Sequence, residues 1–244
     1  MRIAIAVAAA ALLAAPALAD HHSAKNWKFG DGRMPERWSL ENSAYALCDS
    51  GLMQSPIDLA NANAIGSVQI STNYGPHNGK IALGEEKVQV DFSPGHSMIS
   101  GGTTFNLIQV HFHTPAEHAI NGKRHPLTAH FVHATEAGAL GVLGVMFVEG
   151  ATNPELAKIV SAMQSGNGTD ITVDTSKMIP SSLAVYRYMG SLTTPPCSEG
   201  VNWHVAQQTM SASPEQIAAL SAALGSTARS LQPLGNRLLV APAQ

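Results

Sequence analysis

Apolar and polar residues alternate with a period of two along much of the chain between residues 68 and 148. The run from Lys87 to Phe92 shows this clearly, because its valines stand between polar positions. Such alternation is typical of a strand with one face toward the core. The run from Val142 to Val148 is apolar throughout, which predicts a strand covered on both faces. Turn residues separate these runs at residues 94–95, 100–103 and 121–122.

Two later segments carry the signals of helices. Asn153 before Pro154 predicts a helix start, and Gly166 marks its end. The run Ser213-Pro214-Glu215-Gln216 has the spacing of a capping box and opens a second helix, which ends at Gly225. Both carry apolar stripes of the kind that cover a sheet. We therefore expect a single domain, mainly β with peripheral helices (α+β), without internal repeats or linkers.

The first residues of the chain have the pattern of a secretory signal. Arg2 supplies a positive start, an apolar run follows, and Ala17-Leu18-Ala19 matches a small-residue cleavage site. The alternative is a membrane anchor, but the apolar run before Pro16 is too short to span a bilayer comfortably. We expect a signal peptide at 1–19 and a mature domain at 20–244 that has no membrane span and is periplasmic or secreted.

Composition limits the functions open to the chain. Its 244 residues, 45% of them hydrophobic, suffice for one sizeable core. The formal net charge is -3, from 14 basic and 17 acidic residues, and loss of Arg2 with the leader makes it -4. Nucleic-acid-binding domains usually present a basic face, so this mild charge argues against a nucleic-acid partner.

The sequence contains two cysteines, Cys48 and Cys197. In an oxidising compartment they are expected to form one disulfide. Closing so long a loop would stabilise the fold by roughly 4–5 kcal/mol in the chain-entropy account. The alternative is two separate buried thiols.

The candidate chemistry lies in two histidine-bearing runs. In a strand over residues 108–113, His111 and His113 share one face, and the apolar residues from Ile108 onward share the other. A His-x-His pair alone is more often solvated or packed than bound to metal. A third imidazole, His130, lies on the matching face of a second strand. Three neutral nitrogens with an open fourth position are the arrangement of a catalytic zinc.

Several further runs extend this pattern over nearly the whole mature length. They are Trp27-Lys28-Phe29-Gly30, Gln54-Ser55-Pro56-Ile57-Asp58, Gln109-Val110-His111-Phe112-His113, Ala116-Glu117-His118, Ala129-His130-Phe131-Val132-His133, Gly190-Ser191-Leu192-Thr193-Thr194-Pro195-Pro196-Cys197, Trp203 and Gln232-Pro233-Leu234-Gly235-Asn236-Arg237. With these runs the chain resembles the alpha-class carbonic anhydrases of the bacterial secreted type. The resemblance implies a large, mostly antiparallel twisted sheet, zinc in a conical cleft, and reversible hydration of carbon dioxide to bicarbonate and a proton.

The resemblance also assigns roles at the centre of the site. His111, His113 and His130 would bind Zn²⁺, and a zinc-bound hydroxide would be the nucleophile. Zinc lowers the pKa of its bound water to near neutrality, and carbonic anhydrase is itself the standard example of this effect. Glu117 would accept the hydroxyl proton of Thr193. The threonine oxygen could then only accept a hydrogen bond from the nucleophile, which would orient it.

The residues around this centre receive roles from the same resemblance. The apolar wall for carbon dioxide would be Val132, Val142, Leu192 and Trp203, the product would meet Thr194, and hydrogen-bond support would come from Gln109 to His111 and from the backbone of Asn236 to His113.

Two positions depart from the family pattern. Thr128 stands where a glutamate usually supports the third histidine ligand. Such a loss typically costs about 10–100-fold in metal affinity or activity, so we expect weaker zinc retention. Glu86 stands where fast members carry a histidine that passes the proton to solvent, and His96 is a second candidate for this task. We expect turnover to be limited by proton transfer and to rise in imidazole buffers.

Two other functions are compatible with these residues. One is a catalytically weakened, anhydrase-like zinc-binding protein of the periplasm, and the other is a periplasmic zinc store, suggested by the 11 histidines. Relatives without turnover typically lack a zinc-ligand histidine, whereas all three are present here. A store would have no need of Glu117 and Thr193. The sequence leaves open whether the protein is a monomer or a dimer.

Overall fold

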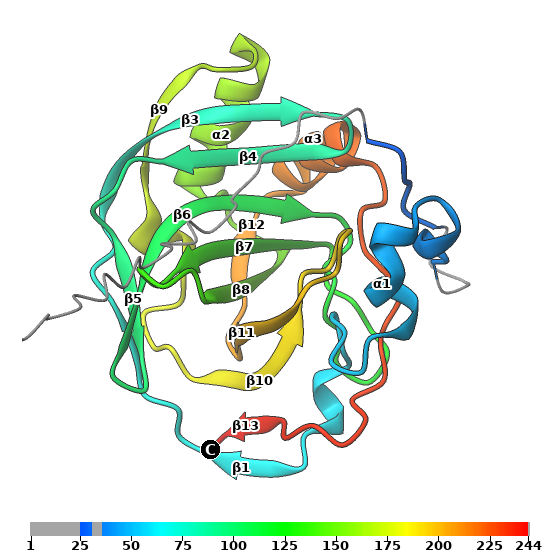
Figure 1. Cartoon of the computed structure of the whole chain (residues 1–244). Coiled ribbons are helices and arrows are strands. Elements are labelled where there is room, and N and C mark those ends of the chain that lie inside the picture. The colour runs from blue at the N-terminus through cyan, green and yellow to red at the C-terminus, as the bar shows by residue number, and fades with distance from the viewer. Residues whose placement is uncertain (1–24, 31–35, 244) are drawn as a thin grey trace, which may run out of the picture.

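One curled sheet forms the body of the molecule (Figure 1). The computed structural model describes residues 25–30 and 36–243, so the predicted leader lies outside the described residues. Thirteen strands of this part follow the order β1-β13-β10-β11-β8-β7-β6-β4-β3-β9, with β5 beside β6, β2 beside β5 and β12 beside β8. The strands are β1 (Ala64–Gly66), β2 (Ile70–Thr72), β3 (Pro76–Gly84), β4 (Lys87–Phe92), β5 (Ser97–Ser100), β6 (Thr103–His113), β7 (Leu127–Ala134), β8 (Leu140–Glu149), β9 (Asp170–Asp174), β10 (Val185–Ser191), β11 (Glu199–Ala206), β12 (Met210–Ala212) and β13 (Val240–Pro242).

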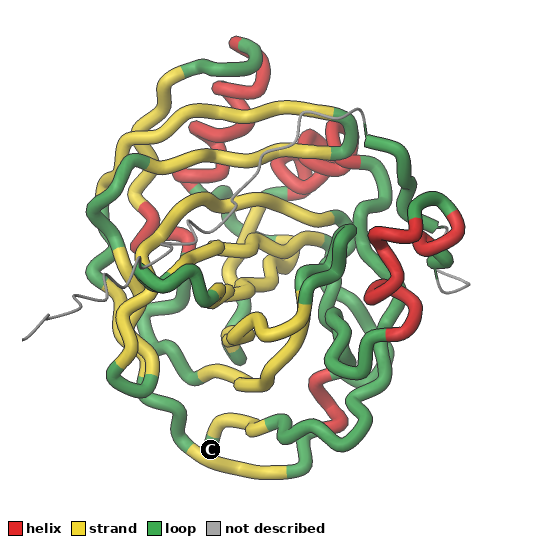
Figure 2. Tube along the Cα trace, in the orientation of Figure 1, coloured by secondary structure: helices red, strands yellow, loops and turns green. Residues whose placement is uncertain are grey.

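The helices are short and lie outside this sheet (Figure 2). They are α1 (Ala46–Ser50), α2 (Pro154–Ser165), α3 (Pro214–Leu224) and the 3-10 helices η1 (Trp38–Leu40), η2 (Ser43–Tyr45), η3 (Leu59–Asn61) and η4 (Thr175–Met178). Parallel pairing among the described strands is confined to β1–β13, β8–β11 and β8–β12. The predicted fold class, a mostly antiparallel sheet with peripheral helices, is therefore confirmed.

Both predicted helices begin where their caps indicated. The Asn153 side chain accepts hydrogen bonds from the first backbone N–H groups of α2, and Ser213 and Gln216 form both bonds of a capping box at α3. Their apolar stripes, which include Leu156 and Leu220, pack against the sheet. None of the helices in residues 25–30 and 36–243 has the length and apolar character needed to cross a membrane.

The two faces of β7 contact different cores. Ala129 and Phe131 belong to the larger core, which also contains the inner faces of α2 and α3. Val132, one residue further, packs against a second core that contains Trp203 and Tyr188. The alternation predicted for this strand is confirmed, and it places the ring of His130 on the side of the second core, 4.9 Å from the Trp203 ring.

β6 departs from simple alternation at Ile108. Leu107 pairs with His133 and Gln109 pairs with Val132, so Ile108 is an extra residue, as in a β-bulge. Leu107 and Val110 are both buried, whereas Ile108 is only half-buried. The prediction that Ile108 shares the buried face with Val110 is wrong, because the bulge changes the phase of the strand.

A disulfide joins Cys48 to Cys197, as predicted. It connects α1 to the loop that follows β10 and carries Thr193. Trp38 is buried beside the disulfide, and Trp27 and Phe29 pack against the same cluster. The bond therefore anchors the N-terminal segment beside the candidate site.

Candidate active site

Three imidazoles converge where β6 and β7 pair. His111 lies directly opposite His130 in the strand register, and His113 follows two residues along β6. We call these three side chains the metal-site histidines. One ring nitrogen from each lies within 4.8 Å of the other two, and no other set of three or more His, Cys, Asp or Glu side chains in the described residues meets this distance. The predicted convergence is therefore confirmed, and neutral imidazoles so close together fit a zinc ion.

Hydrogen bonds orient two of these rings. The Nδ1–H of His111 donates to Gln109 Oε1 at 2.9 Å, which confirms the partner predicted for it. The Nδ1–H of His113 donates to the carbonyl oxygen of Thr227 at 2.7 Å. Each ring therefore keeps Nε2 for a metal. The Nε2 of His113 is buried and has no hydrogen-bond partner among the described residues, as expected for an atom that binds a metal.

The prediction that Asn236 supports His113 is wrong. The supporting carbonyl belongs to Thr227, three residues after the end of α3. Thr227 is held there by Thr114: its N–H donates to the Thr114 carbonyl at 2.8 Å, and its hydroxyl accepts from the Thr114 N–H at 3.1 Å. This pairing brings the chain after α3 beside the end of β6.

The third ring lacks such support. His130 turns Nδ1 toward the other ligands, 3.8 Å from Glu117 Oε2. Its Nε2 is buried without a hydrogen-bond partner among the described residues. Thr128 does not fill this role, because its hydroxyl donates to the carbonyl oxygen of Val145 at 3.1 Å.

Burial favours the neutral form of three imidazoles around the site, those of His111, His118 and His130. It lowers the pKa of His111 and of His130 well below the usual value, and the neighbouring charges of His113 and other cationic groups lower both further. Burial is also the main reason why the pKa of His118 falls to about 3, followed by the charge of Arg124. Metal binding requires neutral imidazole nitrogens, so this environment favours it near neutral pH.

Glu117 lies directly beside the metal-site histidines. Its side chain is fully buried, and its Oε2 is 3.6 Å from His113 Nε2. Its Oε1 accepts the backbone N–H of Arg229 at 3.1 Å. Oε2 has no hydrogen-bond partner among the described residues, so a bond from the buried Thr193 is not formed in this structure. Glu117 is not within 4.8 Å of all three ligand nitrogens, and it therefore does not act as a fourth member of the cluster.

An apolar wall lies next to His130. Val142 on β8 pairs with Val132 on β7 and with Trp203 on β11, so the three form one row across the sheet. Leu192 packs against the same cluster. Thr194 is half-buried in the adjoining turn, where its carbonyl accepts the Cys197 N–H at 2.9 Å. The structure thus brings the predicted wall together.

The two residues considered for proton transfer lie in different environments. Glu86, in the turn between β3 and β4, forms an ion pair with Lys25, whose ammonium lies 5.1 Å from the Phe29 ring. His96 stacks on His77 with ring centroids 3.9 Å apart, near Tyr74, which itself packs against Phe131. Phe131 points away from the metal-site histidines. The suggestion that His96 relays protons is therefore wrong, because the sheet separates it from them.

Comparison with known proteins decides the family. A sequence model of eukaryotic-type carbonic anhydrases matches residues 33–241. The chain belongs to the alpha-class carbonic anhydrases. A carbonic anhydrase from Nostoc sp. is 38% identical over 226 residues, which cover 88% of this chain and 85% of that protein. The alpha-carbonic anhydrase of Thermovibrio ammonificans, solved with sulfanilamide, is 35% identical with a TM-score of 0.78, covering 88% of this chain and 98% of that one. Dioscorin, solved with ascorbate, is 29% identical with a TM-score of 0.77, covering 87% and 97%.

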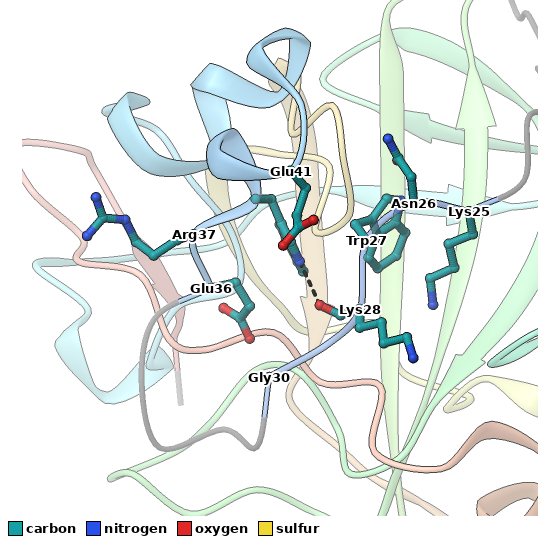
Figure 3. A pocket seen from close by; sticks show the side chains of 9 residues that line it. Lys25, Asn26, Trp27, Lys28, Gly30, Glu36, Arg37 and Glu41 are labelled. Carbon is teal, nitrogen blue, oxygen red and sulfur yellow. Dashed lines mark hydrogen bonds between the residues drawn. The ribbon is translucent and has the colours of Figure 1, made fainter.

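A separate hollow of this carbonic anhydrase lies beside its N-terminal segment (Figure 3). It has a volume of about 480 Å³ and is lined by Lys25, Asn26, Trp27, Lys28, Gly30, Glu36, Arg37, Trp38 and Glu41. The indole N–H of Trp38 donates to the Lys28 carbonyl at 2.7 Å across it. None of the metal-site histidines lines this hollow, so it is distinct from the candidate metal site.

Two residues that hold the side chains of this site in place were not predicted from the sequence. Thr227 acts through its backbone carbonyl, which has no side-chain signature. Arg229 supplies the N–H that holds Glu117. A signal for it exists, because Arg229 is the only charged residue between Glu215 and Arg237.

Proposed function

We propose that this protein is a zinc-dependent carbonic anhydrase that interconverts carbon dioxide and bicarbonate. The observation that carries the proposal is the cluster of metal-site histidines, in which three ring nitrogens face one another and those of His113 and His130 lie 3.6 and 3.8 Å from the buried carboxylate of Glu117. Zinc held by His111, His113 and His130 would supply an activated, water-derived nucleophile at neutral pH. Membership of the family supports the same activity.

In this proposal Glu117 and Thr193 orient the nucleophile. Glu117 Oε1 is occupied by the Arg229 N–H, so Oε2 is the atom that remains to accept the threonine hydroxyl proton. Once its proton is directed at Glu117, the Thr193 oxygen can only accept a hydrogen bond. A lone pair of the nucleophile then points toward the carbon of the substrate. Holding the two reacting groups in this geometry lowers the barrier to their reaction.

The remaining residues bind substrate and support the ligands. Val132, Val142, Leu192 and Trp203 would form the apolar resting place of carbon dioxide, and Thr194 would contact bicarbonate. Gln109 and the Thr227 carbonyl fix the tautomers of the first two ligands. Thr128 leaves the third ligand unsupported, so zinc retention would be weaker than with a glutamate.

Proton release would be the slow step. The Glu86 carboxylate is already engaged in an ion pair with Lys25, so it is poorly placed to relay a proton. Small buffers would therefore carry the proton from the site.

Stopped-flow hydration of carbon dioxide tests the proposal directly. The zinc-loaded protein should catalyse hydration, lose it after chelation and regain it with zinc. Glu117→Gln should lower kcat/KM while zinc binding persists. Zinc-loaded protein with no hydration above the buffer background would refute the proposal.

A second candidate is a catalytically weakened, anhydrase-like zinc-binding protein. The unpartnered Nε2 of His130 favours it, because loss of ligand support lowers both affinity and activity. Zinc binding without hydration in the same experiment would select this candidate over the first.

We further propose that residues 1–19 are a signal peptide and that the domain 20–244 works in the periplasm or outside the cell. The disulfide between Cys48 and Cys197 fits such an oxidising compartment. N-terminal sequencing of the exported protein would test the cleavage site, and sedimentation would decide between a monomer and a dimer.

A further inference from the structure

Arg229 is a buried cation that the assigned roles leave unexplained. Its side chain is only 1% exposed. Within the described residues its guanidinium donates to three uncharged oxygens, Gln54 Oε1 at 2.9 Å, the Ser55 carbonyl at 2.7 Å and the Cys48 carbonyl at 2.6 Å, and its buried Nε has no partner. A buried charge is costly unless its surroundings compensate for it, so its retention calls for a reason.

The three acceptors hold the guanidinium rigidly. All of them lie in the segment 48–55, which the disulfide ties to the loop that carries Thr193. Gln54 also donates to the Cys197 carbonyl at 3.1 Å. The face of the Trp38 ring lies 5.3 Å from the guanidinium carbon. The side chain therefore has little freedom to move relative to this segment.

The backbone of the same residue holds the Glu117 carboxylate. The Arg229 N–H donates to Glu117 Oε1, and the Arg229 carbonyl accepts from Arg124 Nη2 at 2.6 Å. Burial lowers the pKa of both arginines, and the Glu117 carboxylate is the strongest opposing charge on each. The backbone of Arg229 is therefore bonded on one side to the buried Glu117 carboxylate and on the other to the Arg124 guanidinium.

We propose that Arg229 is a positioning residue for Glu117. Its anchored side chain aims the backbone N–H at Oε1, and this fixes the direction of Oε2, the oxygen that would accept the Thr193 hydroxyl in the proposed function. The inference rests on the proposed function, because it concerns the orientation of the carboxylate in the hydration reaction.

Arg237 provides a matched control. It is 9% exposed, donates to the carbonyls of Leu234, Met189 and Pro233, and lies 5.5 Å from the Tyr188 ring. Its own N–H, however, donates to the Leu234 carbonyl at 3.4 Å and not to Glu117. Substitution of either arginine by lysine removes a similar set of side-chain hydrogen bonds. Of the two residues, however, only Arg229 holds the Glu117 carboxylate through its backbone N–H.

The experiment is a double-mutant cycle in the zinc-loaded enzyme. Arg229→Lys should lower kcat/KM for hydration by about 10-fold with unchanged zinc content, as losses of supporting groups do. In the Glu117→Gln background it should have little further effect. Arg237→Lys should leave kcat/KM near that of the wild type in both backgrounds. Additive effects of Arg229→Lys and Glu117→Gln, or equal losses in the two lysine variants, would overturn the proposal.

A second readout does not depend on activity. In unfolding of the zinc-free protein, Arg229→Lys and Glu117→Gln should be coupled, with an unfolding constant that departs from the product of the single effects by about 10-fold. Arg237→Lys should show no such coupling with Glu117→Gln. Equal coupling of the two lysine variants with Glu117→Gln would refute the inference. If Arg229→Lys does not fold, Gln54→Ala removes one anchor and takes its place in both cycles. A protein that fails to hydrate carbon dioxide but shows this coupling would refute the proposed function alone.

Discussion

Histidines lie on both faces of the sheet, and the two sets differ in how their ring nitrogens are used. On the face of Phe131, His133 donates Nδ1–H to the Gly141 carbonyl at 3.1 Å and accepts from the Tyr74 hydroxyl at 2.5 Å, so both nitrogens are satisfied. On the other face, each metal-site histidine directs one nitrogen at its neighbours. The comparison shows that unpartnered nitrogens aimed at one point, and not the number of histidines, distinguish a metal site from packing.

The largest expected difference follows from removing one ring on each face. His113→Ala should abolish zinc binding and reduce hydration to background. His133→Ala should keep both, but it should lower the free energy of unfolding by about 1–3 kcal/mol, because buried polar groups lose their partner. Zinc stoichiometry, stopped-flow hydration and urea unfolding measure these effects. Loss of zinc in His133→Ala would break the comparison.

The next effect comes from giving His130 the support that His133 already has. Thr128→Glu can place an acceptor at the unpartnered Nε2, so zinc dissociation should slow by about 10–100-fold. Thr128→Val is the control, because the hydroxyl it removes donates to Val145 and not to the ring. Dissociation into excess chelator measures both. An unchanged rate in Thr128→Glu would show that His130 needs no support.

The histidines remote from the candidate metal site should govern acid stability. Burial lowers the pKa of His133 to about 4 and that of His204 to about 3, with the charges of Arg187 and His133 adding to the shift of His204. Their unfolded pKa is near 6.5, so below that pH the unfolded chain binds more protons and stability falls.

Each of these residues should contribute up to about 1.4 kcal/mol per pH unit to this loss. The loss of stability is absent well above the pKa of the unfolded chain. It continues as the pH falls to the pKa of the histidine in the folded protein. Urea unfolding of the zinc-free protein between about pH 6 and pH 4.5 measures the slope. His204→Gln should make it shallower, and an unchanged slope would contradict this account.

The smallest effect concerns proton release, for which Glu86, paired with Lys25, is the remaining candidate relay. Turnover should rise severalfold with the concentration of imidazole buffer, because the buffer supplies the proton acceptor. Glu86→Gln should leave this dependence unchanged. Turnover independent of buffer would show that the protein has an internal relay.

Local patterns predicted the parts of the fold that depend on neighbouring residues. The caps at Asn153 and Ser213 and the alternation of β4 all appear as expected. Strands β1 and β13 were not predicted, because each has three residues and their parallel pairing joins Ala64 to Val240 across most of the chain. Such pairing depends on the rest of the sheet and not on local propensity.

The site was predictable where side chains carry the chemistry. The metal-site histidines, Gln109 and the apolar wall were found from alternation and from the family resemblance. Asn236 was assigned wrongly, because the acceptor is a backbone carbonyl and the choice of residue depends on how the chain leaves α3. The bond network of Arg229 joins segments far apart in the sequence, which no local pattern reveals.

The extra residue in β6 has a consequence for how this chain can change over time. Ile108 divides the strand into two stretches that keep separate phases, so both bury their apolar side chains in the same core. Deletion of Ile108 would merge the two phases, and either Phe105 and Leu107 or His111 and His113 would then turn to the opposite face of the sheet. The strand therefore tolerates no loss of a residue at this point.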